Sequence, residues 1–222
     1  MMRRGLALLV LLGLGLPALA VSAEALFDQV AQVLDQGPWE ARLQGRIVAP
    51  GGDVQEADLI VKTLPAEQIV RIEFQKPDAL ADNYVVITPD KVYNYLFLTN
   101  QVVVYPRAKA RIEGLGFDLS RMGDLRKLGE EGEVVWDAPQ EVRFRKRPAW
   151  HVVGRAPDPD ASGFGRVEVW IDREAKRPLR TAFYDAEGRA LSDLEWTAFR
   201  VARFTADDLV AFPPDAEWIE KK

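Results

Sequence analysis

The sequence predicts an α+β protein in which one antiparallel sheet of about 10–11 strands curls or closes, accompanied by an N-terminal helix and a mid-chain helical stretch. Three observations support this fold class. An amphipathic segment follows an apolar leader, apolar and polar residues then alternate along most of the chain, and short turn sequences separate the alternating segments. Consecutive hairpins favour an antiparallel meander. Because no linker, composition shift or repeat interrupts residues 24–222, we expect a single domain there.

The first residues have the pattern of a secretory signal peptide over residues 1–23. Arg3 and Arg4 give the chain a short basic start, Gly5 to Leu16 are almost entirely apolar, and small residues allow cleavage after Ala20 or Ala23. A membrane anchor is the alternative interpretation. A spanning helix needs roughly 20 apolar residues, and this run is shorter and ends at a proline. The leader therefore predicts export to the periplasm.

The composition narrows the class of protein. The chain contains no cysteine, which excludes a lipid anchor on cysteine, disulfides and thiolate metal sites. A net charge of -5 argues against a nucleic-acid partner, which would need a basic surface. The one dense basic cluster has two interpretations, a solvated strand face or a site for anionic lipid headgroups or an acidic partner; it consists of Arg143, Arg145, Lys146 and Arg147.

Residues 23–35 predict an amphipathic helix, because apolar residues recur on one stripe from Leu26 to Leu34 and Gly37-Pro38 follows. Strands with one apolar face come next, for example around Ala57 to Val61. The segments from Tyr84 to Thr88 and from Val92 to Leu98 are apolar on both faces. A strand of that kind must be covered on both faces, by a helix or by a ligand.

The alternation breaks between Arg107 and Gly132, where a loop and a short amphipathic helix are expected. Strands resume at Glu133 and continue to Phe204. Within this part we expect a loop over Pro157–Gly163, and beyond it a capped helical turn over Thr205–Leu209.

No set of residues converges on a catalytic pattern, so the sequence predicts a protein that is not an enzyme and has no metal site or cofactor. His151 is the single histidine and has no metal-ligand spacing around it. Carboxylates on neighbouring strands are the strongest enzyme candidate, as a glycosidase pair, or else they pair with arginines across the sheet. The carboxylates are Glu168, Asp172, Asp193 and Glu195, and the arginines are Arg173, Arg177 and Arg180.

Several motifs occur in an order that identifies a family resemblance. They are Val169-Trp170-Ile171-Asp172, Arg177-Pro178-Leu179, Phe183-Tyr184-Asp185-Ala186-Glu187-Gly188 and the terminal Phe212-Pro213-Pro214, preceded by Lys76-Pro77, Thr88-Pro89-Asp90-Lys91 and Tyr105-Pro106. Together they resemble the outer-membrane lipoprotein-sorting protein family, whose members have LolA-like folds. The resemblance covers nearly the whole chain after the leader.

The resemblance implies an incomplete antiparallel β-barrel with a helical lid over an apolar cavity that takes acyl chains. The cavity residues expected from the strands are Leu43, Leu59, Val61, Val70, Ile72, Phe74, Tyr93, Tyr95, Phe97, Trp170, Phe183 and Trp196. The lid residues expected are Leu26, Phe27, Val30, Met122 and Leu125. The segment Val61-Lys62-Thr63-Leu64-Pro65 departs from the family pattern, since it lacks the arginine of the V-K-R-P segment that is thought to latch the lid.

What the resemblance implies about function is a periplasmic carrier of acyl chains that moves lipoproteins toward the outer membrane. Its partners would be an acylated lipoprotein or lipid, an inner-membrane donor and an outer-membrane acceptor. The alternative is an envelope-stress regulatory or lipid-sensing protein of the RseB type without a transport role.

Overall fold

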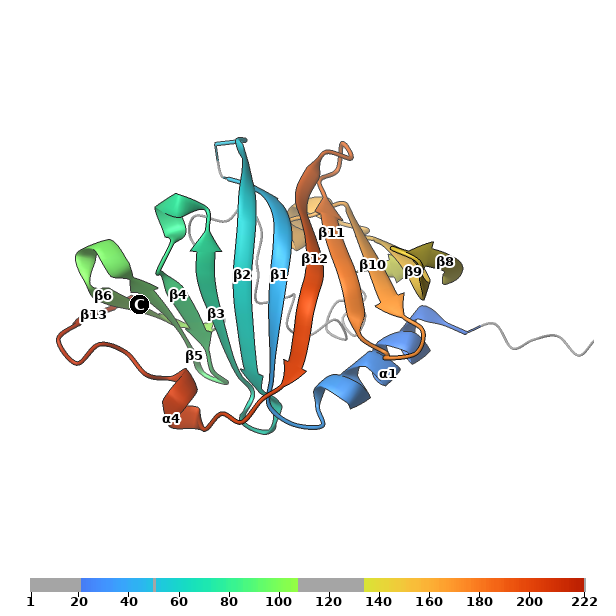
Figure 1. The fold of residues 1–222 in the computed structure, drawn as a ribbon. Coiled ribbons are helices and arrows are strands. Elements are labelled where there is room, and N and C mark those ends of the chain that lie inside the picture. Colours follow the sequence, from blue (N-terminus) through green and yellow to red (C-terminus); the bar gives the residue numbers. More distant parts are fainter. Residues whose placement is uncertain (1–20, 50, 108–133, 222) are drawn as a thin grey trace, which may run out of the picture.

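The computed structural model describes residues 21–49, 51–107 and 134–221. These residues form one 13-stranded sheet in the order β13-β6-β5-β4-β3-β2-β1-β12-β11-β10-β9-β7, with β8 paired to β9 (Figure 1). The strands are β1 (Trp39–Val48), β2 (Val54–Leu64), β3 (Ile69–Lys76), β4 (Tyr84–Ile87), β5 (Lys91–Leu96), β6 (Gln101–Pro106), β7 (Val135–Trp136), β8 (Gln140–Phe144), β9 (Arg147–Arg155), β10 (Arg166–Asp172), β11 (Pro178–Tyr184), β12 (Ala190–Val201) and β13 (Glu217–Glu220). The helices are α1 (Ala23–Leu34), α3 (Pro159–Ser162), α4 (Ala206–Leu209) and the 3-10 turns η1 (Pro65–Glu67), η2 (Asp78–Leu80) and η3 (Phe97–Thr99).

The sheet is open, as an incomplete barrel requires. Its end strands in the described ranges, β13 and β7, pair only with β6 and β9 respectively. All pairs are antiparallel except β13 with β6. The prediction of an incomplete antiparallel barrel is therefore confirmed, with more strands than the sequence predicted. A two-residue strand such as β7 is too short to show alternation, and β13 pairs with a strand more than 100 residues earlier in the chain.

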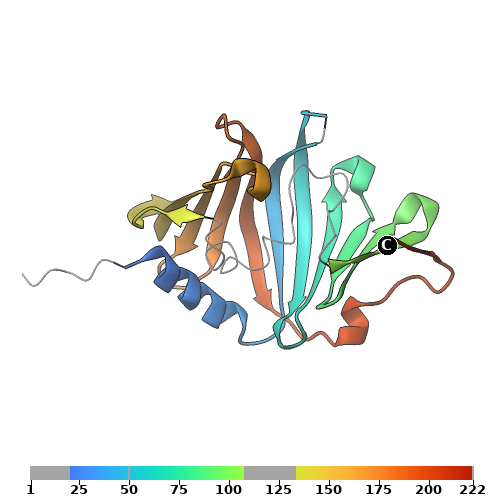
Figure 2. The same ribbon diagram turned by 180° about the vertical axis from the view of Figure 1, so that it is seen from behind.

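Helix α1 confirms the predicted N-terminal helix. The Ser22 side chain caps its first turn by accepting a hydrogen bond from the Ala25 amide at 3.2 Å. Its apolar stripe is buried, whereas Glu24 and Asp28 on the other side are exposed. Figures 1 and 2 show α1 alongside β10 and β11, at one side of the sheet. None of the helices in the described ranges is long and apolar enough to span a membrane.

Two short helices lie where the sequence predicted a capped turn and a loop, and only the first prediction was fully correct. Over Thr205–Leu209 the expected capped turn is α4, with a reciprocal capping box between Thr205 and Asp208. The predicted loop over Pro157–Gly163 was wrong in part, since it contains α3. The Asp158 side chain caps α3, and Pro159 fits its first turn because that position needs no amide donor. The predicted mid-chain helix, with Met122 and Leu125, lies outside the described residues.

Buried apolar side chains form two clusters on opposite faces of the sheet. We call the face that packs against α1 the inner face; its cluster draws on α1 and on β1 to β5 and β9 to β12. The opposite, outer face carries a second cluster, in which β3 to β6 pack against α4 and the chain that follows it. Figure 2 shows this C-terminal segment beside β3 to β5, far from α1. The inner face is thus buried along both halves of the sheet, and the outer face is buried over β3 to β6 as well.

Ion pairs line the exposed part of the outer face. Arg42 donates two hydrogen bonds to Asp58, a carboxylate that is only 8% exposed. Lys62 and Arg71 both donate to Glu73, at 2.7 and 2.8 Å. The hydrogen bond from Arg42 lowers the pKa of Asp58. Burial alone would raise the pKa of Glu73, but the bonds from Lys62 and Arg71 lower it overall.

We expect these carboxylates to make the protein less stable in acid. Because their pKa values are lower in the folded chain, they add stability above the unfolded-state pKa of about 3.9–4.3, and this stability is lost as the pH falls through the folded value. Melting temperatures of wild type and Asp58→Asn, measured from pH 7 downward, should converge in acid. Asp53→Asn, at an exposed turn carboxylate, is the control and should parallel wild type; a parallel course for Asp58→Asn would contradict the expectation.

Candidate functional site

The inner face is a continuous apolar surface because consecutive strands place matching residues opposite one another. Leu43 of β1 faces Leu59 of β2, which faces Phe74 of β3. Two residues further along β2, Val61 faces Ile72 of β3. Ile72 in turn pairs with β4, so the apolar surface continues onto that strand. On the other half, Val167, Val169 and Ile171 of β10 are fully buried on this face.

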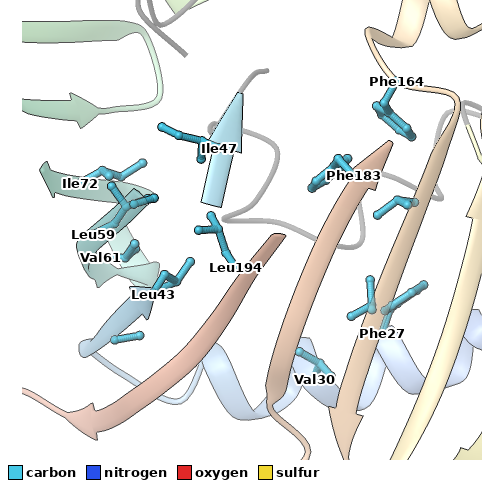
Figure 3. Packing of buried hydrophobic residues seen from close by; sticks show 14 of the residues in the cluster. Phe27, Val30, Leu43, Ile47, Leu59, Val61, Ile72, Phe164, Phe183 and Leu194 are labelled. Atoms are coloured by element: carbon cyan, nitrogen blue, oxygen red, sulfur yellow. The ribbon is translucent and has the colours of Figure 1, made fainter. Parts of the chain in front are cut away.

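Apolar contact holds α1 on the inner face. Leu26, Phe27 and Val30 are each at most 3% exposed, and the Phe27 ring lies 4.6 Å from the Trp136 ring of β7. Figure 3 shows Phe27 and Val30 beside the strands that carry Phe183 and Leu194. In the described ranges, the one direct hydrogen bond between α1 and a strand runs from Trp39 Nε1 to the Leu34 carbonyl at 3.0 Å. Within the described residues, α1 is therefore attached mainly by apolar contacts.

A few buried polar atoms interrupt the apolar inner face. Ser192 is 1% exposed and Thr63 is 4% exposed, and neither hydroxyl has a hydrogen-bond partner in the parts of the chain that the structure describes. The same holds for the indole nitrogens of Trp136 and Trp196. Unbonded donors at such positions are suited to water or to the polar part of a ligand.

The structure gathers eight of the twelve predicted cavity residues in the inner-face cluster: Leu43, Leu59, Val61, Val70, Ile72, Phe74, Phe183 and Trp196. The predicted lid residues Leu26, Phe27 and Val30 belong to the same cluster. Period-2 alternation therefore identified most of this surface.

Four predicted cavity residues lie elsewhere. Tyr93 and Tyr95 belong to the outer-face cluster, where Tyr93 contacts Phe212 at 5.5 Å between ring centroids. Phe97 begins η3 and is 50% exposed. Trp170 stacks on His151 at 4.3 Å on the outer face. Strands β4 and β5, which are apolar on both faces, are covered on the outer face by the C-terminal segment.

The carboxylates tested for glycosidase chemistry take part in ion pairs and turns. Asp193 accepts two hydrogen bonds from Arg180, and Glu195 pairs with Arg145. Glu168 lies 3.1 Å from Nε2 of His151. The Asp172 carboxylate caps the turn that follows β10 by accepting from two backbone amides. In the described ranges, no group of three or more metal-ligating side chains is arranged to hold an ion.

The outer face carries an open pocket of about 390 Å³ between β5, β6, β13 and the C-terminal segment. Tyr93, Phe212 and Trp218 line it, and an ion pair between Lys91 and Glu220 stands at its edge. It lies on the opposite face from α1.

Comparison with known proteins agrees with this geometry. An open sheet with a helix over one apolar face is the LolA-like fold: a Vibrio parahaemolyticus domain named for outer membrane lipoprotein sorting aligns with a TM-score of 0.50 at 14% identity, over 84% of this chain and 95% of that one. MucB in complex with MucA(peri) aligns with a TM-score of 0.50 at 14% identity, over 88% of this chain and 61% of that one. At such identities the likeness shows the fold alone.

A third structure gives the family. The chain belongs to the same family as an uncharacterized conserved protein from Thermus thermophilus, with 32% identity and a TM-score of 0.69 over 90% of this chain and 99% of that one. No protein-family model matches the sequence, and no curated protein matches it.

Proposed function

We propose that the protein is a periplasmic, non-enzymatic carrier of acyl chains that shields acylated lipoproteins on their way to the outer membrane. The observation that carries the proposal is the apolar inner face with α1 attached to it by apolar contacts. When α1 separates, the surface it leaves matches an acyl chain in chemistry. Each methylene buried there would contribute about 0.8 kcal/mol, so a long chain can compensate for the lost contacts of the helix.

The proposal predicts tighter binding of cargo when α1 is held less tightly, because the helix and the acyl chain compete for the same inner-face surface. Phe27→Ala removes the ring that contacts Trp136, and since about 1.4 kcal/mol of lost packing is a tenfold change, we expect the dissociation constant of a fluorescent long-chain fatty acid to fall at least about tenfold. Fluorescence titration measures this dissociation constant. Asp28→Ala, on the exposed side of α1, is the matched control and should leave the dissociation constant unchanged.

Lipid that copurifies with the wild-type protein tests the carrier function itself. Native mass spectrometry of the wild-type protein, purified from a host with an envelope, should show bound lipid or a bound acylated peptide. Absence of both would contradict the carrier proposal. Recovery of a membrane-protein partner with an empty inner face would instead favour the regulatory alternative.

Export gives a further prediction, because α1 begins at the end of the leader. Cleavage after Ala23 would remove the Ser22 cap and the buried Ala23, whereas cleavage after Ala20 keeps both. We expect a mature chain that starts at Val21. Intact-mass measurement on protein from the periplasmic fraction decides between the two sites, and a chain that starts at Glu24 would show that the cap is dispensable.

A further inference from the structure

Positive charge gathers at one end of the sheet although the whole chain is acidic. Residues 141–147 and 172–177 include seven basic and three acidic side chains, a net charge of +4, whereas the whole chain has a net charge of -5. The first segment forms the β8–β9 hairpin tip and the second forms the turn between β10 and β11. We call these two segments together the basic rim.

The two segments of the basic rim form one surface. The amide of Arg173 donates to the Pro148 carbonyl at 3.1 Å, which ties the turn to the start of β9. Arg147 lies 4.0 Å from the Asp172 carboxylate, across the same junction. Figure 1 places β8 and β9 next to β10, on the side of the sheet where α1 lies.

Much of this charge is available for a partner. Arg143, Lys146, Lys176 and Arg177 form no ion pair within the described part of the chain; Arg143 lies near the end of β8 and Lys146 in the hairpin turn that follows. At that turn Arg145 and Lys146 have φ values of 45° and 72°, a conformation usual for asparagine or glycine. The hairpin therefore presents long cationic side chains where short residues would cost less backbone strain.

Aromatic side chains connect the basic rim to the inner face. The Arg173 guanidinium lies 4.9 Å from the Trp150 ring, and Arg177 lies 4.6 Å from the Phe199 ring. Phe199 in turn contacts Trp39, whose indole bonds the last residue of α1. Cations beside half-buried aromatic rings are the composition found where proteins meet the headgroup region of a bilayer.

We propose that the basic rim docks the protein on an anionic lipid bilayer, with the neighbouring end of the inner face turned toward the lipid. Phosphate headgroups would meet the unpaired cations, and the rings of Trp150 and Phe199 would lie at headgroup depth. Transfer of cargo at that surface rests on the proposed function, whereas docking itself does not, so each is tested separately. The acidic remainder of the surface would hold the other faces away from the same membrane.

Vesicle co-sedimentation of cargo-free protein tests the docking. We expect binding to phosphatidylglycerol–phosphatidylcholine vesicles at low salt, little binding to pure phosphatidylcholine vesicles, and loss of binding in high salt. The double variant Lys146→Glu/Lys176→Glu should bind the anionic vesicles at least about 25-fold more weakly, because each cation near an anionic surface contributes about fivefold. Thermal melts establish that the variant is folded, and Lys146→Gln/Lys176→Gln is the milder version.

The matched control is Arg46→Glu/Lys221→Glu, which makes the same change in net charge at exposed positions away from the basic rim. We expect its vesicle affinity to stay close to that of wild type. An equal loss in this control, or equal binding to neutral and anionic vesicles, would overturn the proposal. Fatty-acid binding by the rim variants should be unchanged, so a failure of docking is distinguishable from a failure of the carrier function.

Discussion

Replacing Leu209 with alanine is expected to lower the free energy of unfolding by about 2–5 kcal/mol, the usual cost of a large cavity in a core. Leu209 is the buried side chain of α4, and it is only 1% exposed in the outer-face cluster. The surrounding backbone is held in place, since Arg71 donates to the Leu209 and Ala211 carbonyls and Tyr84 donates to the Ala211 carbonyl. The site therefore cannot collapse easily to fill the space.

Urea unfolding measures this loss as a lower midpoint with an unchanged slope. The matched control is the same chemical change at Leu98→Ala, where the side chain is 88% exposed and the effect should stay within about 0.5 kcal/mol. Fatty-acid binding by folded Leu209→Ala should equal that of wild type, because the two clusters lie on opposite faces. If Leu209→Ala lost as little free energy of unfolding as Leu98→Ala, the C-terminal segment would add little to stability.

The second large effect is expected at Gly45, in the middle of the ladder between β1 and β12. A Cβ atom there would lie 1.9 Å from the carbonyl oxygen of Asp193 and 3.0 Å from its carbonyl carbon. These are backbone atoms of the neighbouring strand, so they can move away only if the strands separate. We expect Gly45→Ala to cost about 1–3 kcal/mol through overpacking.

Gly37→Ala is the control, since nothing lies within 4 Å of a Cβ at that position. Both variants are compared by thermal and urea unfolding, and only Gly45→Ala should lose stability. A stable Gly45→Ala protein would show that β1 and β12 tolerate a local bulge, as they already do between Arg42 and Leu43.

Local patterns predicted the N-terminal helix, the capped turn and most of the antiparallel strands, whereas the incomplete barrel was predicted from the family resemblance. The stripe of α1 and the capping residues of α4 are local signals, and both were read correctly. Alternation also identified the inner face of β1, β2 and β3, since one side of these strands is polar. In each case the information lies within a few residues of the element concerned.

What escaped prediction depends on contacts between distant segments. Tyr93 and Val92 are both apolar, so period 2 could not decide which of them faces α1. The answer comes from Phe212, which reaches Tyr93 from the far end of the chain. Trp170 was placed with the apolar residues, although its ring lies between the His151 ring and the Arg180 guanidinium on the outer face. An aromatic ring that stacks on polar groups has no distinguishing pattern in the sequence.

The position of β1 has a consequence for how the chain folds. Its two neighbours are β2, which follows it directly, and β12, whose paired residues lie about 150 positions later. The hairpins from β1 to β6 can form as soon as they emerge, but the open edge of β1 stays unpaired until residue 201 is present. The pairing of β1 with β12, which joins the two halves of the sheet, is therefore a late step in folding. Until then, the unpaired edge of β1, like that of β6 before β13 is present, can pair with another molecule.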